Sequence, residues 1–147
     1  MPHKRIDAMK YFWFTLTMML CINASAQAAF TGPDFSGVYD CTGQDKTEGA
    51  YKGKVTIRLV PEQSTGEYGA YQFLLEIPEY GAYPGHAAAQ GKKMAIYFAN
   101  KDSKDHDFGT GIATFSKNQR GKWSFVKFYY EPEYKKGNFG KETCTQR

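Results

Sequence analysis

The sequence predicts an all-β protein, a small antiparallel up-and-down barrel of seven to eight strands. Apolar and polar residues alternate with a period of two through most of the chain after residue 28, and no long helical stripe interrupts them. Gly, Asn, Asp and Pro separate the alternating segments into short pieces, as turns between strands do. Two cysteines, Cys41 and Cys144, stand near the two ends of this region. A β-sandwich is the alternative architecture that the same pattern allows.

The alternation places the individual strands. In the segment Lys54–Val60, for example, Val55, Ile57 and Leu59 share one face, and Pro61 then ends the segment because proline cannot donate to the ladder. The expected strands are Phe35–Cys41, Lys54–Val60, Tyr71–Ile77, Lys93–Asn100, Gly109–Ser116, Trp123–Glu131 and a last short strand through Cys144. The alanine-rich stretch Gly85–Gln90 is the one helical candidate, and Asn118–Gly121 is a turn.

The beginning of the chain has the three parts of a secretory signal peptide. Basic residues come first, an apolar run at Tyr11–Ile22 follows, and Ala-x-Ala sites end at Ala26 and Ala28. The apolar run is too short to cross a bilayer as a helix. We therefore expect residues 1–28 to be a cleavable leader, with Met1 or Met9 as the start. The expected mature protein is one domain, 29–147, in the periplasm or secreted, without a membrane anchor.

Export also predicts how the cysteines are used. Cys21 belongs to the leader, so the mature chain keeps the pair Cys41 and Cys144, and an even pair in an oxidising compartment indicates a disulfide. Bridged Cα atoms lie within about 7 Å of each other. The first and last strands must then be neighbours, which favours the barrel over the sandwich.

Charge and motifs argue against several classes of function. Residues 29–147 carry 16 basic and 14 acidic side chains, a net charge of +2, which is no footprint for nucleic acid. Asp105-x-Asp107-x-Gly109 lacks the remaining ligands of a calcium loop. Two histidines, His86 and His106, are too few for a zinc site. We expect no metal, no cofactor and no catalytic residue.

A short repeat gives the first set of candidate binding residues. Glu67-Tyr68-Gly69-Ala70-Tyr71 recurs as Glu79-Tyr80-Gly81-Ala82-Tyr83. Glycine permits tight turns, and tyrosine offers a flat apolar face with a polar tip, so such loops suit sugar rings or a protein cleft. Aromatic plugs that pack the ends of the barrel are the alternative interpretation. The candidates are Ser64, Glu67, Tyr68, Tyr71, Tyr80 and Tyr83.

A second set follows the most aromatic strand. The alternative binding residues are Tyr130, Glu131, Glu133 and Tyr134. Glu131 and Glu133 would also be the best catalytic candidates. A glycosidase, however, needs two carboxylates held apart across a cleft, and neighbours on one short segment are poorly placed for that. We therefore expect the protein not to be an enzyme.

Tyr39-Asp40-Cys41 and the closing Cys144 resemble the small periplasmic inhibitors of c-type lysozyme. In that family a Tyr-x-Cys near the mature start is bridged to a late cysteine of a small antiparallel barrel, and a Ser-Gly-x-x-Tyr loop enters the lysozyme cleft. The nearest segment here, Ser64-Thr65-Gly66-Glu67-Tyr68, has a different spacing. The resemblance implies an inhibitor that acts by occlusion.

Together these observations predict an exported, non-catalytic binding module for a lysozyme or a cell-wall glycan. The alternative is a carrier that holds a small molecule inside the barrel, because barrels of about eight strands can enclose one small ligand. The carrier hypothesis depends on the interior, which Trp123, Phe125 and Phe128 would fill if they all pointed inward. The sequence leaves the oligomeric state open.

Overall fold

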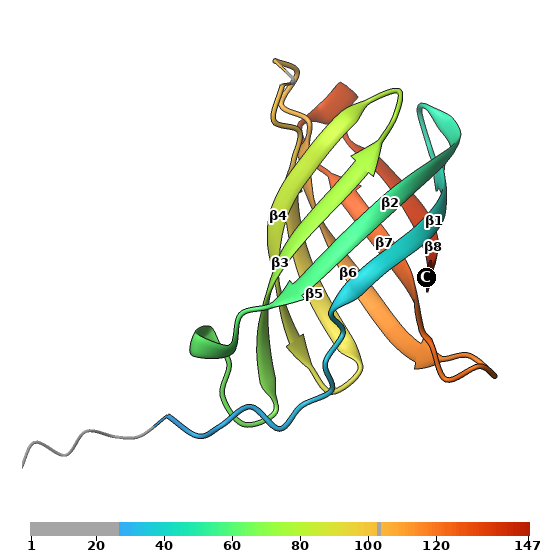
Figure 1. Cartoon of the computed structure of the whole chain (residues 1–147). Helices are drawn as coiled ribbons and strands as arrows, with labels where there is room; N and C mark the ends of the chain where they lie inside the picture. The colour runs from blue at the N-terminus through green and yellow to red at the C-terminus, as the bar shows by residue number, and fades with distance from the viewer. Residues whose placement is uncertain (1–26, 103) are drawn as a thin grey trace, which may run out of the picture.

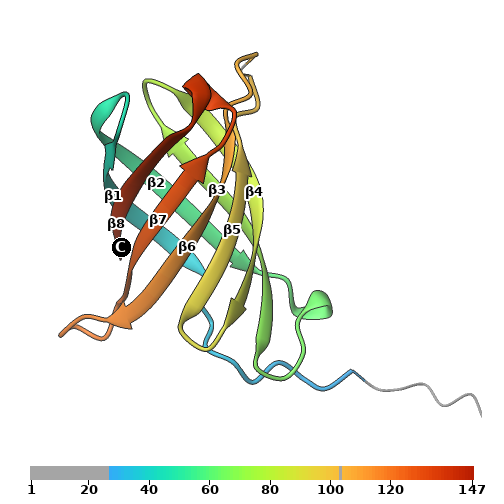
Figure 2. The same ribbon diagram turned by 180° about the vertical axis from the view of Figure 1, so that it is seen from behind.

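The structure, a computed structural model, describes residues 27–147 except Ser103 and forms a closed eight-stranded antiparallel barrel (Figures 1 and 2). Residues 1–26 of the predicted leader, with Met1, Met9 and Ala26, lie outside the described residues. Within the described part of the chain, no helix is long and apolar enough to cross a membrane.

Each strand pairs with its neighbours in sequence, and the last pairs with the first. The barrel is therefore of the up-and-down type, as predicted. The strands are β1 (Gly37–Asp45), β2 (Gly49–Leu59), β3 (Tyr68–Ile77), β4 (Gly81–Gln90), β5 (Lys93–Ala99), β6 (Phe108–Lys117), β7 (Trp123–Glu131) and β8 (Asn138–Gln146). Two 3₁₀ turns, η1 (Pro61–Gln63) and η2 (Tyr134–Lys136), lie in the connections after β2 and β7.

The predicted disulfide closes the barrel. Cys41 on β1 stands directly opposite Cys144 on β8, their Cα atoms are 4.1 Å apart, and the two sulfur atoms are bonded. Both side chains are buried. The covalent bond therefore lies in the one seam that joins the two ends of the sheet, and the sequence-based preference for a barrel over a sandwich is confirmed.

The prediction of a helical turn at Gly85–Gln90 is wrong. These residues belong to β4, which pairs with β3 on one side and β5 on the other. The two ladders satisfy the backbone groups that a helix would have paired internally, so tertiary context overrides the preference of alanine. Ala87 and Ala89 point inward, where their small side chains fit a narrow interior.

One end of the barrel is sealed by aromatic rings. Phe35, which precedes β1, stacks on Phe115 with ring centroids 4.0 Å apart, and Trp123 meets Phe35 edge-on at 4.9 Å. Tyr39 and Phe125 continue the cluster inward, with centroids 5.2 Å apart. The chain before β1 runs beneath this end, as Figure 1 shows in blue. Packed rings leave no way for a ligand to enter here.

The disulfide should contribute strongly to stability because it closes a loop of 103 residues. The loop-entropy treatment gives about 4–5 kcal/mol for a loop of this size. We expect the double variant Cys41→Ala, Cys144→Ala to lose a large part of this free energy of unfolding in a urea titration. Equal midpoints for the variant and the oxidised wild type would contradict this account.

Candidate binding site at the open end of the barrel

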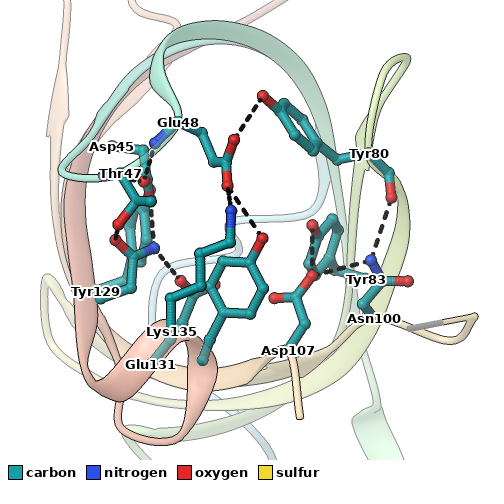
Figure 3. Close-up of polar contacts among 12 residues, drawn as sticks. Asp45, Thr47, Glu48, Tyr80, Tyr83, Asn100, Asp107, Tyr129, Glu131 and Lys135 are labelled. Atoms are coloured by element: carbon teal, nitrogen blue, oxygen red, sulfur yellow. Dashed lines mark hydrogen bonds and ion pairs between the residues drawn. The ribbon is translucent and has the colours of Figure 1, made fainter. Parts of the chain in front are cut away.

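The other end of the barrel holds a polar chamber. Four connections meet there, those between β1 and β2, β3 and β4, β5 and β6, and β7 and β8 (Figures 1 and 3). The enclosed volume is about 40 Å³, room for a few water molecules. The chamber is lined by ionisable groups and tyrosines: Asp45, Glu48, Asp107, Lys127, Glu131, Glu142, Tyr51, Tyr80, Tyr83, Tyr129 and Tyr134.

An ion pair forms the floor of the chamber. Lys127 on β7 stands opposite Glu142 on β8, the Nζ and Oε2 atoms are 2.6 Å apart, and both side chains are fully buried. The Tyr51 hydroxyl donates a hydrogen bond to the other oxygen of Glu142 at 2.5 Å. A buried charge is tolerated only when it is paired and hydrogen-bonded. Glu142 has both the ion pair and a hydrogen bond from Tyr51, whereas Lys127 has only the ion pair among its polar contacts with the described residues.

The ammonium of Lys127 has few polar contacts. Its short contact with Glu142 lacks hydrogen-bond geometry, and Nζ has no hydrogen-bond partner in the described part of the chain. Three aromatic rings surround it instead, with centroids 5.1 Å away for Phe73, 5.1 Å for Phe98 and 5.3 Å for Tyr129. Ring faces attract a cation, which offsets part of its lost hydration. Beyond the ion pair with Glu142, the ammonium of Lys127 still has N–H donors that can meet an acceptor in the chamber.

Above the floor, Asp45 organises one wall. It accepts hydrogen bonds from the Tyr129 hydroxyl at 2.7 Å and Asn138 Nδ2 at 2.8 Å, and from the backbone N–H groups of Thr47 and Glu48. Burial by itself would raise the pKa of Asp45, but these four donors outweigh it and hold the pKa below its usual value. Asp45 is therefore a fixed anion.

Asp107 plays the corresponding part on the opposite wall. Its Oδ2 accepts hydrogen bonds from the Tyr83 hydroxyl at 2.9 Å and from Asn100 Nδ2 at 3.0 Å. These contacts tie the β5–β6 connection to β4 (Figure 3). The tyrosine ring is thereby fixed with its face along the chamber wall.

Glu131 stands between these two walls with an altered acidity. It is buried, it accepts a hydrogen bond from Asn138 Nδ2 at 2.6 Å, and it shares a side-chain hydrogen bond with Asp107. Burial raises its pKa to about 7; the hydrogen bond from Asn138 lowers it, and the nearby carboxylates of Asp107 and Asp45 raise it. The carboxyl group is therefore half-protonated near neutral pH.

Four side chains cross the mouth of the chamber, and we call them the latch. Glu48 pairs with Lys135, and it accepts hydrogen bonds from Tyr134 at 3.1 Å and Tyr80 at 3.3 Å. Figure 3 shows Glu48 between Tyr80 and Lys135 at the rim. Lys135 has a φ of 46°, in the left-handed region that non-glycine residues rarely adopt. Exposed ion pairs contribute little to stability, so the latch can open readily.

Two glycines make room for the chamber's tyrosines. A Cβ atom at Gly43 would collide with the ring of Tyr51, and one at Gly140 would collide with the hydroxyl of Tyr129. Any larger residue would displace these rings from the interior. At these two positions of β1 and β8, the space that a side chain would take is filled by the tyrosines of the neighbouring strands β2 and β7.

The chamber brings together four of the residues predicted from sequence. Tyr80 and Tyr83 come from the first set, and Glu131 and Tyr134 come from the second set. Of the remaining residues of the second set, Tyr130 is exposed on the outer wall and Glu133 pairs with His106 at 3.1 Å.

The other members of the first set lie at the sealed end, because the two copies of the repeat stand at opposite ends of β3. Ser64 is buried and binds the Val60 carbonyl and the Ala70 N–H. Tyr71 is buried and donates to the Pro33 carbonyl at 2.9 Å. Glu67 accepts a hydrogen bond from Gln90, and Tyr68 is 54% exposed. The structure thus does not unite the first set into one surface.

The residues that the chamber most depends on are not among those predicted from sequence: Asp45, Asp107, Lys127, Asn138 and Glu142. The available signal was the alternation of Phe125, Lys127, Tyr129 and Glu131 on one face of β7, which the structure places inside. Phe128, on the opposite face, is exposed. The outward face is the more apolar one, so hydrophobic patterning alone selects the wrong side.

No family model, curated protein or solved structure matches this chain. Among the described residues, the only group of side chains close enough to hold a metal is Cys41, Glu142 and Cys144, whose sulfur atoms are joined in the disulfide. The assignment of function therefore depends on the chamber's own chemistry.

The raised pKa of Glu131 predicts a pH-dependent stability. The folded protein keeps a proton up to a pH of about 7, whereas the unfolded chain loses it near 4.5. The free energy of unfolding should therefore fall as the pH rises from 4.5 to 7 and change little from this cause above 7. Glu131→Gln should remove this decline and be the more stable protein at pH 8, as measured by urea titrations. A parallel decline in the variant would show that another group is responsible.

Proposed function

We propose that this protein is an exported, non-catalytic binding protein that holds a small polar ligand in the chamber. The observation that carries the proposal is the asymmetry of the barrel. One end is sealed by packed rings, and the other encloses buried ionisable groups beneath a latch of side chains. Small ligand sites combine a concave, pre-formed cavity with a few convergent polar groups, which describes this end of the barrel.

The energetics of the polar end support a role in binding. Buried charged groups cost folding free energy, and packing them against each other repays only part of it. The sealed end of the same barrel is filled with aromatic side chains, so this fold can be completed without charges. A protein that keeps Lys127, Glu131 and Glu142 inside retains them at a cost in stability, and ligand recognition accounts for that cost.

The interior limits the size of the ligand. The rings of the sealed end and the apolar side chains above them occupy the lower barrel, so only the chamber and its mouth remain for a ligand. Phe125 points inward and Phe128 outward, so the aromatic strand fills the interior only in part. The ligand is therefore a small molecule, or a small polar group of a larger molecule whose remainder stays at the rim.

The placement of the two best catalytic candidates favours binding over catalysis. Glu131 lies inside the chamber, whereas Glu133 is exposed and pairs with His106. The two carboxylates do not face one cleft, as an acid and its partner must in glycoside hydrolysis.

Titration of the oxidised protein with a panel of small amines, polyols, sugars and carboxylic acids, followed by amide NMR shifts, tests the proposal. We expect at least one compound to shift residues of the chamber. The latch variant Tyr80→Ala, Tyr134→Ala should weaken that binding several-fold, since both rings line the chamber. Tyr97→Ala, which removes an exposed ring from the outer wall, is the matched control and should leave it unchanged. A panel without any binder in the chamber would overturn the proposal.

A second candidate, inhibition of a lysozyme or binding of a cell-wall glycan, is favoured by the turn at the sealed end. Tyr68 projects from this turn into solvent, while Ser64 beneath it is fixed by two hydrogen bonds. A rigid turn with an exposed aromatic residue is suited to insertion into a cleft.

If the turn is inhibitory, the oxidised protein should block a c-type lysozyme, and Tyr68→Ala should weaken inhibition by more than tenfold, because aromatic anchors dominate such interfaces. The assay follows lysis of bacterial cell walls at increasing protein concentration, with Tyr97→Ala as the control. Full lysis at every concentration of the wild type would eliminate this candidate.

A further inference from the structure

We infer that the ligand of the chamber is a small hydroxylated amine, a molecule with an ammonium group and an oxygen acceptor a few bonds away. This inference rests on the proposed function and adds the chemical class of the ligand. The ammonium group would lie against the neighbouring carboxyl groups of Glu131 and Asp107, and the oxygen would reach down toward Lys127.

The first argument is the charge of the chamber. Its two lysines are both engaged, Lys127 with Glu142 and Lys135 with Glu48. Three acidic side chains have no cation within ion-pair distance in the described part of the chain: Asp45, Asp107 and Glu131, the last of which is only partly ionised near neutral pH. Their exposed fractions are 6%, 7% and 6%. Because charges interact strongly away from water, a chamber with this surplus favours a cationic guest.

The second argument is independent of the acidic groups. Lys127 Nζ is fully buried, lines the chamber and has no hydrogen-bond partner among the described residues. An ammonium carries three donors and no acceptor, and the ion pair with Glu142 engages at most one of them, so an oxygen acceptor in the chamber would satisfy those that remain. A simple cation would be repelled by Lys127 and would leave these donors unused. The ligand therefore needs both groups.

The positions of Lys127 and Glu131 along β7 determine which end of the ligand lies deeper in the chamber. Lys127 and Glu131 lie on the same inward face of this strand, four residues apart, with Glu131 at the open end. A ligand that enters from the mouth thus presents its oxygen first and keeps its ammonium near Glu131. The tyrosine rings of the wall add an aromatic surface for the cation, as the three rings around Lys127 already provide for the protein's own ammonium.

A metal ion is a poorer guest for the same carboxylates. Asp45, Asp107 and Glu131 do not form a group whose oxygen atoms could all reach one ion. Asn138 Nδ2 donates to both Asp45 and Glu131, and the hydroxyls of Tyr129 and Tyr83 donate to Asp45 and Asp107. An organic ammonium group, which needs fewer and less regular acceptors than a metal ion, fits this arrangement.

Three matched two-carbon probes test the inference: ethanolamine has both groups, ethylamine has only the cation, and ethylene glycol has only oxygen acceptors. In NMR titrations of the oxidised protein we expect ethanolamine to bind the chamber about tenfold more tightly than either of the others, because it alone makes both charge-assisted contacts. Glu131→Gln and Asp107→Asn should each weaken ethanolamine binding by about tenfold. Glu133→Gln, an exposed position two residues along the chain, is the matched control and should not change it.

A double variant separates the role of Lys127 from a fault in folding. Lys127→Met, Glu142→Leu replaces the buried pair by apolar residues of similar size, a change that is often neutral or stabilising for a buried ion pair. In this variant ethanolamine and ethylamine should bind equally. A preference for ethylene glycol or acetate over ethanolamine in the wild-type chamber would overturn the inference and leave the proposed function standing. If the chamber binds none of the amines, polyols, sugars or carboxylic acids, both this inference and the proposed function are overturned.

Discussion

Closure of the sheet through β1 and β8 is the constraint on which the rest of the structure depends. Eight strands joined in a ring enclose an interior only as wide as the side chains that fill it. Once Cys41 stands opposite Cys144, the register of both strands is fixed, and with it the set of residues that point inward. A slip of one residue in β8 would turn Glu142 outward and Lys141 inward. The disulfide therefore fixes the contents of the barrel as well as its ends.

The interior that closure creates is divided between two kinds of chemistry. Apolar and aromatic side chains supply the stability at the sealed end, where Phe35 fills the opening. The Lys127–Glu142 pair marks the boundary, and above it Asp45, Asp107 and Glu131 are held in place by tyrosine and asparagine donors. Such groups are pre-organised, so their side chains would lose little conformational entropy when a ligand binds. This division is the physical basis for assigning binding to one end.

Much of the fold could be predicted from sequence because closure and strand pairing leave clear signals. Alternation, turn residues and the two separated cysteines predict a disulfide-closed barrel. Gly85–Gln90 is assigned to the wrong element, and much of the tyrosine repeat that was expected in loops belongs to β3 and β4. The chamber was harder to predict. Tyr80, Tyr83, Glu131 and Tyr134 attract attention through a repeat and an aromatic segment, but their partners Asp45 and Asp107 lie in other connections, distant in sequence. Which face of β7 is inside could not be decided from hydrophobicity, because its outward face carries Val126, Phe128 and Tyr130.

The central claim, that the open end is a ligand chamber, is tested most directly by a crystal structure of the oxidised protein grown with ethanolamine. The account predicts the ligand beneath the latch, with its nitrogen in hydrogen-bond contact with Glu131 or Asp107 and its oxygen on the side of Lys127. Ethanolamine bound only to the outer wall, or a chamber closed by protein side chains with no ligand in it, would contradict the account.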